Sequence, residues 1–168
     1  MVTIRAEIPA DLQAIREVNE TAFETPAEAR LVDRLRQRGK LLVSLVAEEA
    51  GRVVGHIAFS RARLSAAPGT FGLGLGPMAV IPSCQNRGIG SRLAVQGLSQ
   101  CVRLGAHFVV VLGHPHFYPR FGFLPAARFR LACKWPVPEG VFMALETRPG
   151  SLADAGGLVS YEAEFDDV

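Results

Sequence analysis

The chain has 168 residues, of which 49% are hydrophobic and 20% are charged, and its formal net charge at pH 7 is +2. This length favours one domain, and the composition is that of a globular protein that buries a substantial core. The small net charge argues against a nucleic-acid partner, but it leaves room for a local site that binds a small anion.

The cysteines Cys84, Cys101 and Cys133 are odd in number and contain no Cys-x-x-Cys pair. This pattern argues against a disulfide framework and a zinc cluster, so we expect reduced thiols, a cytoplasmic location and no metal. Arg5 and Glu7 make the N-terminus unlike a signal peptide. No uncharged apolar stretch approaches about 18 residues, so we expect no membrane span.

The N-terminal part of the chain alternates between β-rich runs and helical patterns. Apolar residues in 12–23 and 27–35 recur at the spacing of an amphipathic helix, and Gly39 closes the second pattern. The β-rich runs on either side of the Gly51-Arg52 turn predict a hairpin. The elements predicted here are a strand over 2–7, helices over about 10–22 and 27–38, and strands over 41–49 and 53–64.

The C-terminal part adds strands and a third helix. Small and apolar residues recur at helical spacing over about 88–104, and Gly105 ends that pattern. The Val-rich run 108–112 is typical of a strand that is buried on both faces. The remaining predicted strands cover 71–81, 140–146 and 158–165. The order predicts an α/β (α+β) fold, a helix-flanked sheet of mixed direction in one domain over 1–168, with 147–168 adding a strand.

The most informative segment joins the strand that ends near Pro82 to the third helix. Its loop reads Gln85-Asn86-Arg87-Gly88-Ile89-Gly90-Ser91. The first N–H groups of a helix lack intrahelical acceptors and lie at the positive end of the helix dipole, so they bind anions. The two glycines let a bulky ligand approach the backbone, and Arg87 and Arg92 add positive charge. The loop therefore predicts a site for a diphosphate or polyphosphate.

Two other phosphate-binding motifs do not fit. The chain contains no Gly-x-x-x-x-Gly-Lys-Ser/Thr string of the Walker type. The segment Gly74-Leu75-Gly76-Pro77-Met78-Ala79 matches the loose dinucleotide-binding fingerprint, but it lies within a predicted strand and is followed by Pro82 rather than by a helix. We interpret this second match as accidental.

Two segments together resemble motifs of the GNAT superfamily of N-acetyltransferases. Residues 85–90 fill the pattern Gln/Arg-x-x-Gly-x-Gly/Ala, and residues 118–123 fill the family's Tyr-x-x-x-Gly-Phe. The order of predicted elements over 2–146 is also similar to that family. The run 113–123 resembles a subgroup of predicted acetyltransferases whose acceptors are mostly unassigned. The resemblance implies the acyl-CoA N-acyltransferase fold, with a mixed, mostly antiparallel central sheet, and acetyl-CoA as the acyl donor.

The resemblance also implies roles for particular residues. Met78, Ala79 and Val80 are implied to pair their backbone groups with the pantetheine arm and the acetyl carbonyl. Tyr118 is implied to protonate the leaving thiolate. The residues implied to hold the pyrophosphate are Gln85, Asn86, Arg87, Gly88, Ile89, Gly90 and Ser91. Many family members carry an asparagine ahead of the tyrosine, whereas this chain has Leu112-Gly113-His114-Pro115-His116 there.

Acyl transfer to an amine needs a base for the amine proton and a donor for the oxyanion, and an acid for the thiolate assists it. Backbone N–H groups near 78–80 are the candidate donors, and Tyr118 is the candidate acid. Glu24 is the candidate base, because this region borders the acceptor pocket in similar proteins. His56 and His114 stay open as alternatives.

Several of these residue types have a plain structural interpretation as well. Tyr118 fits a packed aromatic cluster, and Cys84 fits an incidental small residue beside the loop. His114 and His116 have no third ligand at a telling spacing, so we favour a loop over a metal site. Trp135 fits either the core or the wall of a pocket.

We therefore predict an N-acetyltransferase that moves an acetyl group from acetyl-CoA to a primary amine of a small molecule or protein, by direct attack in a ternary complex. The alternatives are a non-catalytic acyl-CoA-binding or interaction module on the same fold, and a nucleotide-binding protein. The acceptor is not specified, because we expect variable loops around 20–30, 62–70 and 134–140 to build its pocket. A homodimer and a longer acyl donor also stay open.

Overall fold

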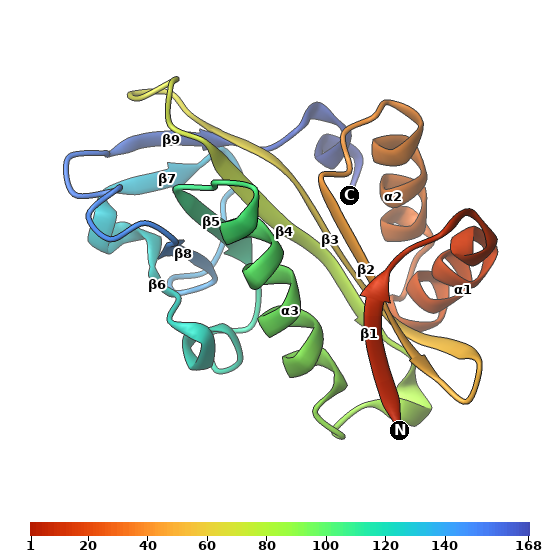
Figure 1. Cartoon of the computed structure of the whole chain (residues 1–168). Coiled ribbons are helices and arrows are strands. Elements are labelled where there is room, and N and C mark those ends of the chain that lie inside the picture. The colour runs from red at the N-terminus through yellow and green to blue at the C-terminus, as the bar shows by residue number, and fades with distance from the viewer. The chain divides into compact units, whose positions relative to one another are not determined.

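The computed structural model describes all residues from 1 to 168, which form two compact units (Figure 1). The first unit comprises residues 1–60, 76–100 and 163–168, and the second comprises 61–75 and 101–162. The long strands β3 (Arg52–Leu64) and β4 (Gly72–Val80) each contribute residues to both units.

The sheet of the first unit is built from the N-terminal strand and the predicted hairpin. Strand β1 (Val2–Ala6) pairs antiparallel with β2 (Val43–Glu49), and β2 pairs antiparallel with β3. Between β2 and β3, Ala50 and Gly51 have φ values of 50° and 76°. Two successive left-handed residues form the tight turn that suits the twist of a hairpin. The predicted hairpin is thus confirmed.

Helices cover both faces of this sheet. Successive residues of a strand point to opposite faces. Phe59 of β3 lies against Gly97 of α3 (Ile89–Arg103), where an added Cβ would lie 2.5 Å from the phenylalanine ring. His56 of β3 lies three residues away, on the other face, and its Nδ1 lies 3.3 Å from Asn19 Nδ2 of α1 (Leu12–Ala22). Helices α1 and α3 therefore pack on opposite faces of the first unit's sheet.

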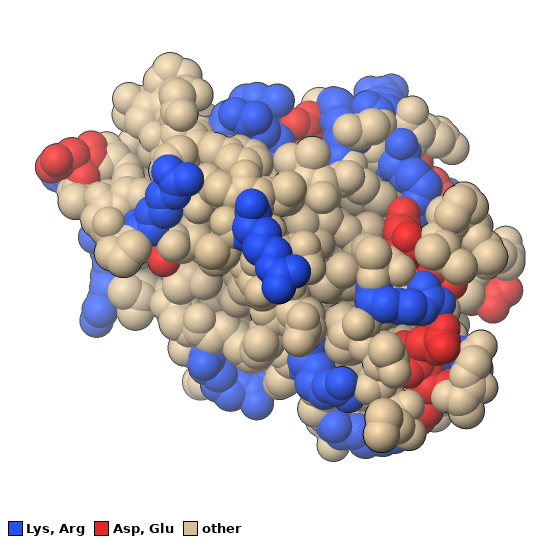
Figure 2. Space-filling model, viewed as in Figure 1, with Lys and Arg blue, Asp and Glu red and all other residues tan.

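Helix α2 (Ala27–Gln37) packs beside α1, and both bury one apolar stripe. Acidic and basic side chains are interleaved over these two helices (Figure 2), as in the ion pair between Arg16 and Glu20 of α1 and that between Arg36 and Asp33 of α2. The buried positions are Ile15, Val18 and Asn19 of α1 and Ala29, Leu31, Val32 and Leu35 of α2. The predicted helices are confirmed, and none of the helices is both long and apolar enough to cross a membrane.

The second unit contains the strand predicted to be buried on both faces. The first part of β4 pairs in parallel with β5 (Phe108–Leu112), and β5 pairs antiparallel with β8 (Phe142–Glu146). Residues 108–111 are at most 1% exposed, which confirms the prediction. Strand β8 also pairs with the short β6 (Leu124–Pro125).

A smaller ladder completes the second unit. The end of β3 pairs antiparallel with β9 (Gly157–Ser160), which pairs in parallel with β7 (Leu131–Cys133). The pairings of β7 with β9 and of β4 with β5 are parallel, and the other pairings described are antiparallel. The predicted fold class, a mixed and mostly antiparallel sheet flanked by helices, is confirmed.

The predicted strand over 158–165 is wrong in its extent. Strand β9 ends at Ser160, and Ala163–Asp167 form a 3-10 helix in the first unit. The Glu164 carboxylate is buried and accepts hydrogen bonds from Lys40 Nζ, at 2.9 Å, and from Arg38. These contacts hold the segment to the chain that follows α2. Strands β6 and β7 went unpredicted because they are too short to show a period.

Candidate functional site

The predicted phosphate loop lies in the first unit, between the end of β4 and the start of α3. The strand end is fixed because Ile81 N–H donates to Val54 O of β3 at 3.0 Å. A 3-10 turn (Pro82–Cys84) follows, and the Gln85 side-chain amide reaches back to donate to Val80 O at 2.9 Å. The loop is thus folded onto the strand that precedes it.

The N-terminus of α3 has the geometry of an anion site. The first hydrogen bond into the helix runs from Arg92 N–H to Gly88 O, so the N–H groups of residues 89–91 have no intrahelical acceptor. Gly88 has a φ of 80°, and a Cβ added there would meet nothing within 4 Å. The conformation favours glycine, and the space beside it is open. Ile89 is 2% exposed and anchors the helix start in the core.

The charged side chain of this loop has a partner within the protein. Both terminal nitrogens of Arg87 donate to the Glu49 carboxylate, at 3.0 and 2.6 Å. This contact lowers the pKa of Glu49 and raises that of Arg87. Sequence reasoning missed Glu49, because nothing in a strand-ending glutamate indicates which of the many arginines it meets.

Residues 78–80 form the last part of β4 that leads into the loop. Ala79 is buried, whereas Met78 and Val80 are half-buried, as the alternation of a strand requires. The structure therefore brings 78–80 and 85–91 together in one continuous strand–loop–helix segment of the first unit.

The candidate bases differ sharply in their surroundings. Glu24 is exposed on the connection between α1 and α2. His114 is also exposed, in the second unit. His56 is fully buried, and burial lowers its pKa to about 4. A neutral, enclosed imidazole has no surface on which to meet an amine, so the structure favours Glu24 or His114 over His56.

His56 instead belongs to a partly buried polar network. Its Nε2 lies 2.9 Å from Ser44 Oγ, and the Ser44 hydroxyl donates to Glu7 at 2.6 Å. Arg36 donates twice to the same Glu7 carboxylate, at 3.0 and 2.8 Å. With the Ser44 proton directed to Glu7, the neutral His56 ring donates from Nε2 to Ser44 and accepts from Asn19 at Nδ1. Both ring nitrogens of His56 therefore have partners within the protein, and we interpret the network as structural rather than catalytic.

Tyr118 lies in the second unit, at the start of a 3-10 helix (Tyr118–Phe121). Its ring packs edge-on against Phe117 and Phe123, with centroids 5.0 and 5.7 Å away. Burial raises its pKa to about 12. A Cβ added at Gly113 would lie 2.3 Å from the Tyr118 ring. Only glycine therefore fits at that position, which gives a physical reason for the first residue of the 113–123 run.

Two further candidate residues of the second unit have ordinary surroundings. His116 is exposed, and no group of three potential metal ligands occurs in the protein. Trp135 is half-buried, stacks edge-on against Tyr161 at a centroid distance of 5.5 Å, and lies under the Lys134 ammonium group. Trp135 is therefore part of an aromatic cluster near the surface.

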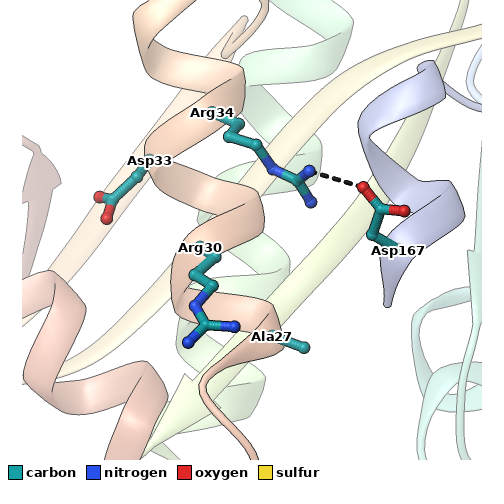
Figure 3. Close-up of a pocket in the computed structure, with 5 residues that line it drawn as sticks. All are labelled: Ala27, Arg30, Asp33, Arg34 and Asp167. Atoms are coloured by element: carbon teal, nitrogen blue, oxygen red, sulfur yellow. Dashed lines mark hydrogen bonds and ion pairs between the residues drawn. The ribbon is translucent and has the colours of Figure 1, made fainter.

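A pocket of about 370 Å³ lies in the first unit, between α2 and the C-terminal 3-10 helix (Figure 3). Arg34 reaches across to Asp167, with 2.7 Å between Nη1 and Oδ2. The lining residues are Ala27, Arg30, Asp33, Arg34 and Asp167. None of them belongs to the predicted site, so the pocket gives the coenzyme prediction no support.

Comparison with known sequences places the chain in a family. The pattern of the acetyltransferase (GNAT) family matches residues 12–123. The uncharacterized N-acetyltransferase YhbS of Escherichia coli K12 is 37% identical over 163 residues, covering 96% of this chain and 97% of the relative. The uncharacterized N-acetyltransferase YjhQ of the same strain is 38% identical over 134 residues, covering 77% and 74% of the two chains.

Solved structures agree with this placement. The crystal structure of the Escherichia coli YhbS protein in complex with CoA is similar with a TM-score of 0.93 at 36% identity, covering 98% of this chain and 92% of that one. A GNAT family acetyltransferase from Brucella melitensis in complex with acetyl-CoA gives a TM-score of 0.81 at 37% identity and covers 99% of each chain. With the family pattern matched over most of its length and such relatives spanning nearly all of it, the chain belongs to the GNAT family of acetyltransferases.

Proposed function

We propose that the protein is an N-acetyltransferase that transfers the acetyl group of acetyl-CoA to a primary amine of a small molecule or protein. The amine attacks the thioester directly in a ternary complex, without a covalent enzyme intermediate. The observation that carries the proposal is the open N-terminus of α3, with N–H groups that have no intrahelical acceptor beside Gly88. The CoA and acetyl-CoA complexes of similar proteins support the choice of ligand.

The segment 85–91 forms the pyrophosphate site in this proposal. The backbone N–H groups of Ile89, Gly90 and Ser91 donate to phosphate oxygens, and the helix dipole adds favourable potential. The half-buried Ser91 side chain adds a hydroxyl donor. Gly88 leaves the space that a diphosphate needs to reach the backbone. These donors are held in place before the ligand arrives.

The chemical step uses residues 78–80 and Tyr118. Backbone N–H groups of Met78 to Val80 hold the pantetheine arm and donate to the acetyl oxygen as negative charge develops on it. The neutral amine nitrogen bonds to the carbonyl carbon and gives the tetrahedral oxyanion, which expels the thiolate as the carbon–sulfur bond breaks. The nitrogen loses its extra proton to solvent as the amide forms. The Tyr118 hydroxyl then gives its proton to the thiolate. With a pKa of about 12, this hydroxyl stays protonated at neutral pH and is a weaker acid than an exposed tyrosine.

Glu24 is the proposed base. Its carboxylate is exposed and makes no hydrogen bond or ion pair, so it is available to accept a proton from the incoming ammonium group, directly or through water. Replacing Glu24 by Gln is therefore the variant that tests the base, once an acceptor amine is known.

Calorimetric titration of the full chain with acetyl-CoA tests the proposal. We expect a dissociation constant in the micromolar range or below. Ser91→Asp places a carboxylate in the first turn of α3, where it suits the helix dipole but repels a phosphate. We expect affinity to fall at least about tenfold while thermal stability is kept. The matched control Ser99→Asp, at an exposed position of the same helix, leaves affinity unchanged.

The possible results separate the alternatives. Failure of the wild type to bind at micromolar concentrations, or tighter binding of ATP or NAD than of acetyl-CoA, contradicts the proposal. A panel of primary amines, with release of free CoA thiol as the readout, then distinguishes an enzyme from a module that only binds acyl-CoA.

A further inference from the structure

We propose that Glu49 is a positioning residue for the phosphate-binding loop, and that Arg87 tethers this loop to strand β2 instead of contacting the coenzyme. The inference rests on the proposed function, because it concerns how residues 85–91 bind acetyl-CoA. It differs from the expectation drawn from sequence, in which the Arg87 charge itself holds the pyrophosphate.

The contact between the two side chains fixes an orientation. Arg87 Nη1 lies 3.0 Å from Glu49 Oε2, and Arg87 Nη2 lies 2.6 Å from Glu49 Oε1. Two parallel hydrogen bonds between a guanidinium group and a carboxylate fix the relative orientation of both planes. The guanidinium group is thereby directed to the end of β2, and both of its terminal nitrogens are engaged.

Of the two partners, Glu49 is the one that the sheet holds. Its backbone lies between two neighbouring strands, in register with Val2 of β1 and with Arg52 of β3. Arg87 lies in a loop, outside any ladder. The ion pair therefore holds the loop in a fixed position relative to the sheet.

The loop needs such a restraint. Asn86 has a φ of 60° and Gly88 a φ of 80°, so two left-handed residues flank Arg87. Side-chain attachments hold the loop on both sides of Asn86: the Gln85 amide bonds to Val80 O, and Arg87 pairs with Glu49. A loop that is already ordered loses less conformational entropy when a ligand binds, so these attachments raise affinity without touching the ligand.

The competing arrangement is that Arg87 leaves Glu49 and pairs with a phosphate oxygen. The two arrangements predict opposite effects of removing the Glu49 charge. If Glu49 positions the loop, its loss weakens coenzyme binding. If Glu49 competes with a phosphate for Arg87, its loss strengthens binding.

The test is calorimetric titration of acetyl-CoA into the full-length wild type and the variants Glu49→Gln, Arg87→Gln and the double variant. We expect each single variant to bind about five- to tenfold more weakly, and the double variant to bind no more weakly than either, because both changes remove one shared interaction. The swapped pair Glu49→Arg with Arg87→Glu restores the contact, so we expect it to recover most of the lost affinity.

A neighbouring residue supplies the matched control. Glu48 also lies on β2 and pairs with an arginine, Arg5, at 2.6 Å. Glu48→Gln removes one ion pair from the same strand, and we expect it to leave the affinity for acetyl-CoA unchanged. Melting temperatures of the free variants, which we expect to stay close to the wild type because exposed ion pairs add little stability, separate a binding effect from unfolding.

Three results overturn the inference: Glu49→Gln binds acetyl-CoA as tightly as the wild type, or more tightly, or the swapped pair binds more weakly than either single variant. If Glu49→Gln binds acetyl-CoA more tightly than the wild type while Arg87→Gln binds it more weakly, Arg87 contacts a phosphate oxygen. If the wild type itself binds no acetyl-CoA, the proposed function is wrong as well. If it binds and Glu49→Gln has no effect, only this inference is wrong.

Discussion

Burial determines the acidity of the Tyr118 hydroxyl group. The residue is 6% exposed among aromatic rings, and the same burial raises its pKa to about 12. A phenol in these surroundings is a proton donor at neutral pH and not a base. Gly113 shapes this environment at close range, because a side chain there would collide with the ring.

Tyr118→Phe keeps the packing and removes the proton. We expect turnover with a competent amine to fall by about 10²-fold or more, within the usual range for general acids, and the affinity for acetyl-CoA to stay unchanged. Initial rates and calorimetry measure the two quantities. Tyr161→Phe, which removes the chain's other tyrosine hydroxyl, also a buried one, is the control that keeps its turnover. Undiminished turnover in Tyr118→Phe would exclude the proposed acid.

At the scale of elements, α3 is placed by the close approach of its glycine to the sheet. Phe59 is fully buried and lies across Gly97, so the helix sits nearer to β3 than any side chain at that position would allow. The same helix presents its N-terminus to the phosphate loop. Packing in the middle of α3 thus fixes where its N-terminus lies.

Gly97→Ala tests this packing. The added Cβ would lie 2.5 Å from a fully buried ring, and such overpacking costs about 1–3 kcal/mol. The better helix propensity of alanine offsets at most about 1 kcal/mol of this. We therefore expect a lower melting temperature in a thermal scan, whereas Ser99→Ala, exposed on the same helix, leaves it unchanged or slightly raised. A melting temperature of Gly97→Ala at or above that of the wild type contradicts the packing argument.

The partly buried polar network of His56 bears on the stability of the whole molecule. It joins residues of α1, α2, β2 and β3 with Glu7, which follows β1, and all of these belong to the first unit. Burial is the main cause that lowers the pKa of His56 from 6.5 to about 4; the Glu7 charge opposes the shift, and the Arg36 charge adds to it.

This shift predicts how stability depends on pH. Between pH 6.5 and pH 4 the unfolded chain binds a proton at His56 and the folded protein does not. The stabilisation is therefore complete above about pH 6.5 and is lost as pH falls, by about 3 kcal/mol over the full window. Urea unfolding between pH 7 and pH 5 measures the slope of the unfolding free energy against pH, because most carboxylates titrate below this range. We expect a shallower slope for His56→Gln and a wild-type slope for His116→Gln. Equal slopes for wild type and His56→Gln contradict the prediction.

Local sequence determined the longer regular elements and the loop proposed to bind phosphate. The periods of α1, α2 and α3 and the Val-rich run of β5 depend on neighbouring residues alone, and so does the strand–loop–helix segment with its glycines. A helix N-terminus binds anions because of its own backbone, whatever surrounds it. Because the motifs and the periodic patterns depend on neighbouring residues, the family resemblance and the fold class were both predictable without a structure.

The tertiary structure decided which distant side chains meet. Arg87 pairs with a residue 38 positions away, and His56 is enclosed between Ser44 and Asn19 rather than exposed as a base. The last predicted strand ends at Ser160, and Glu164 pairs with Lys40, which follows α2. Periodicity and motif spacing report the conformation of a segment, whereas burial, pKa and pairing depend on the contacts that folding creates between segments.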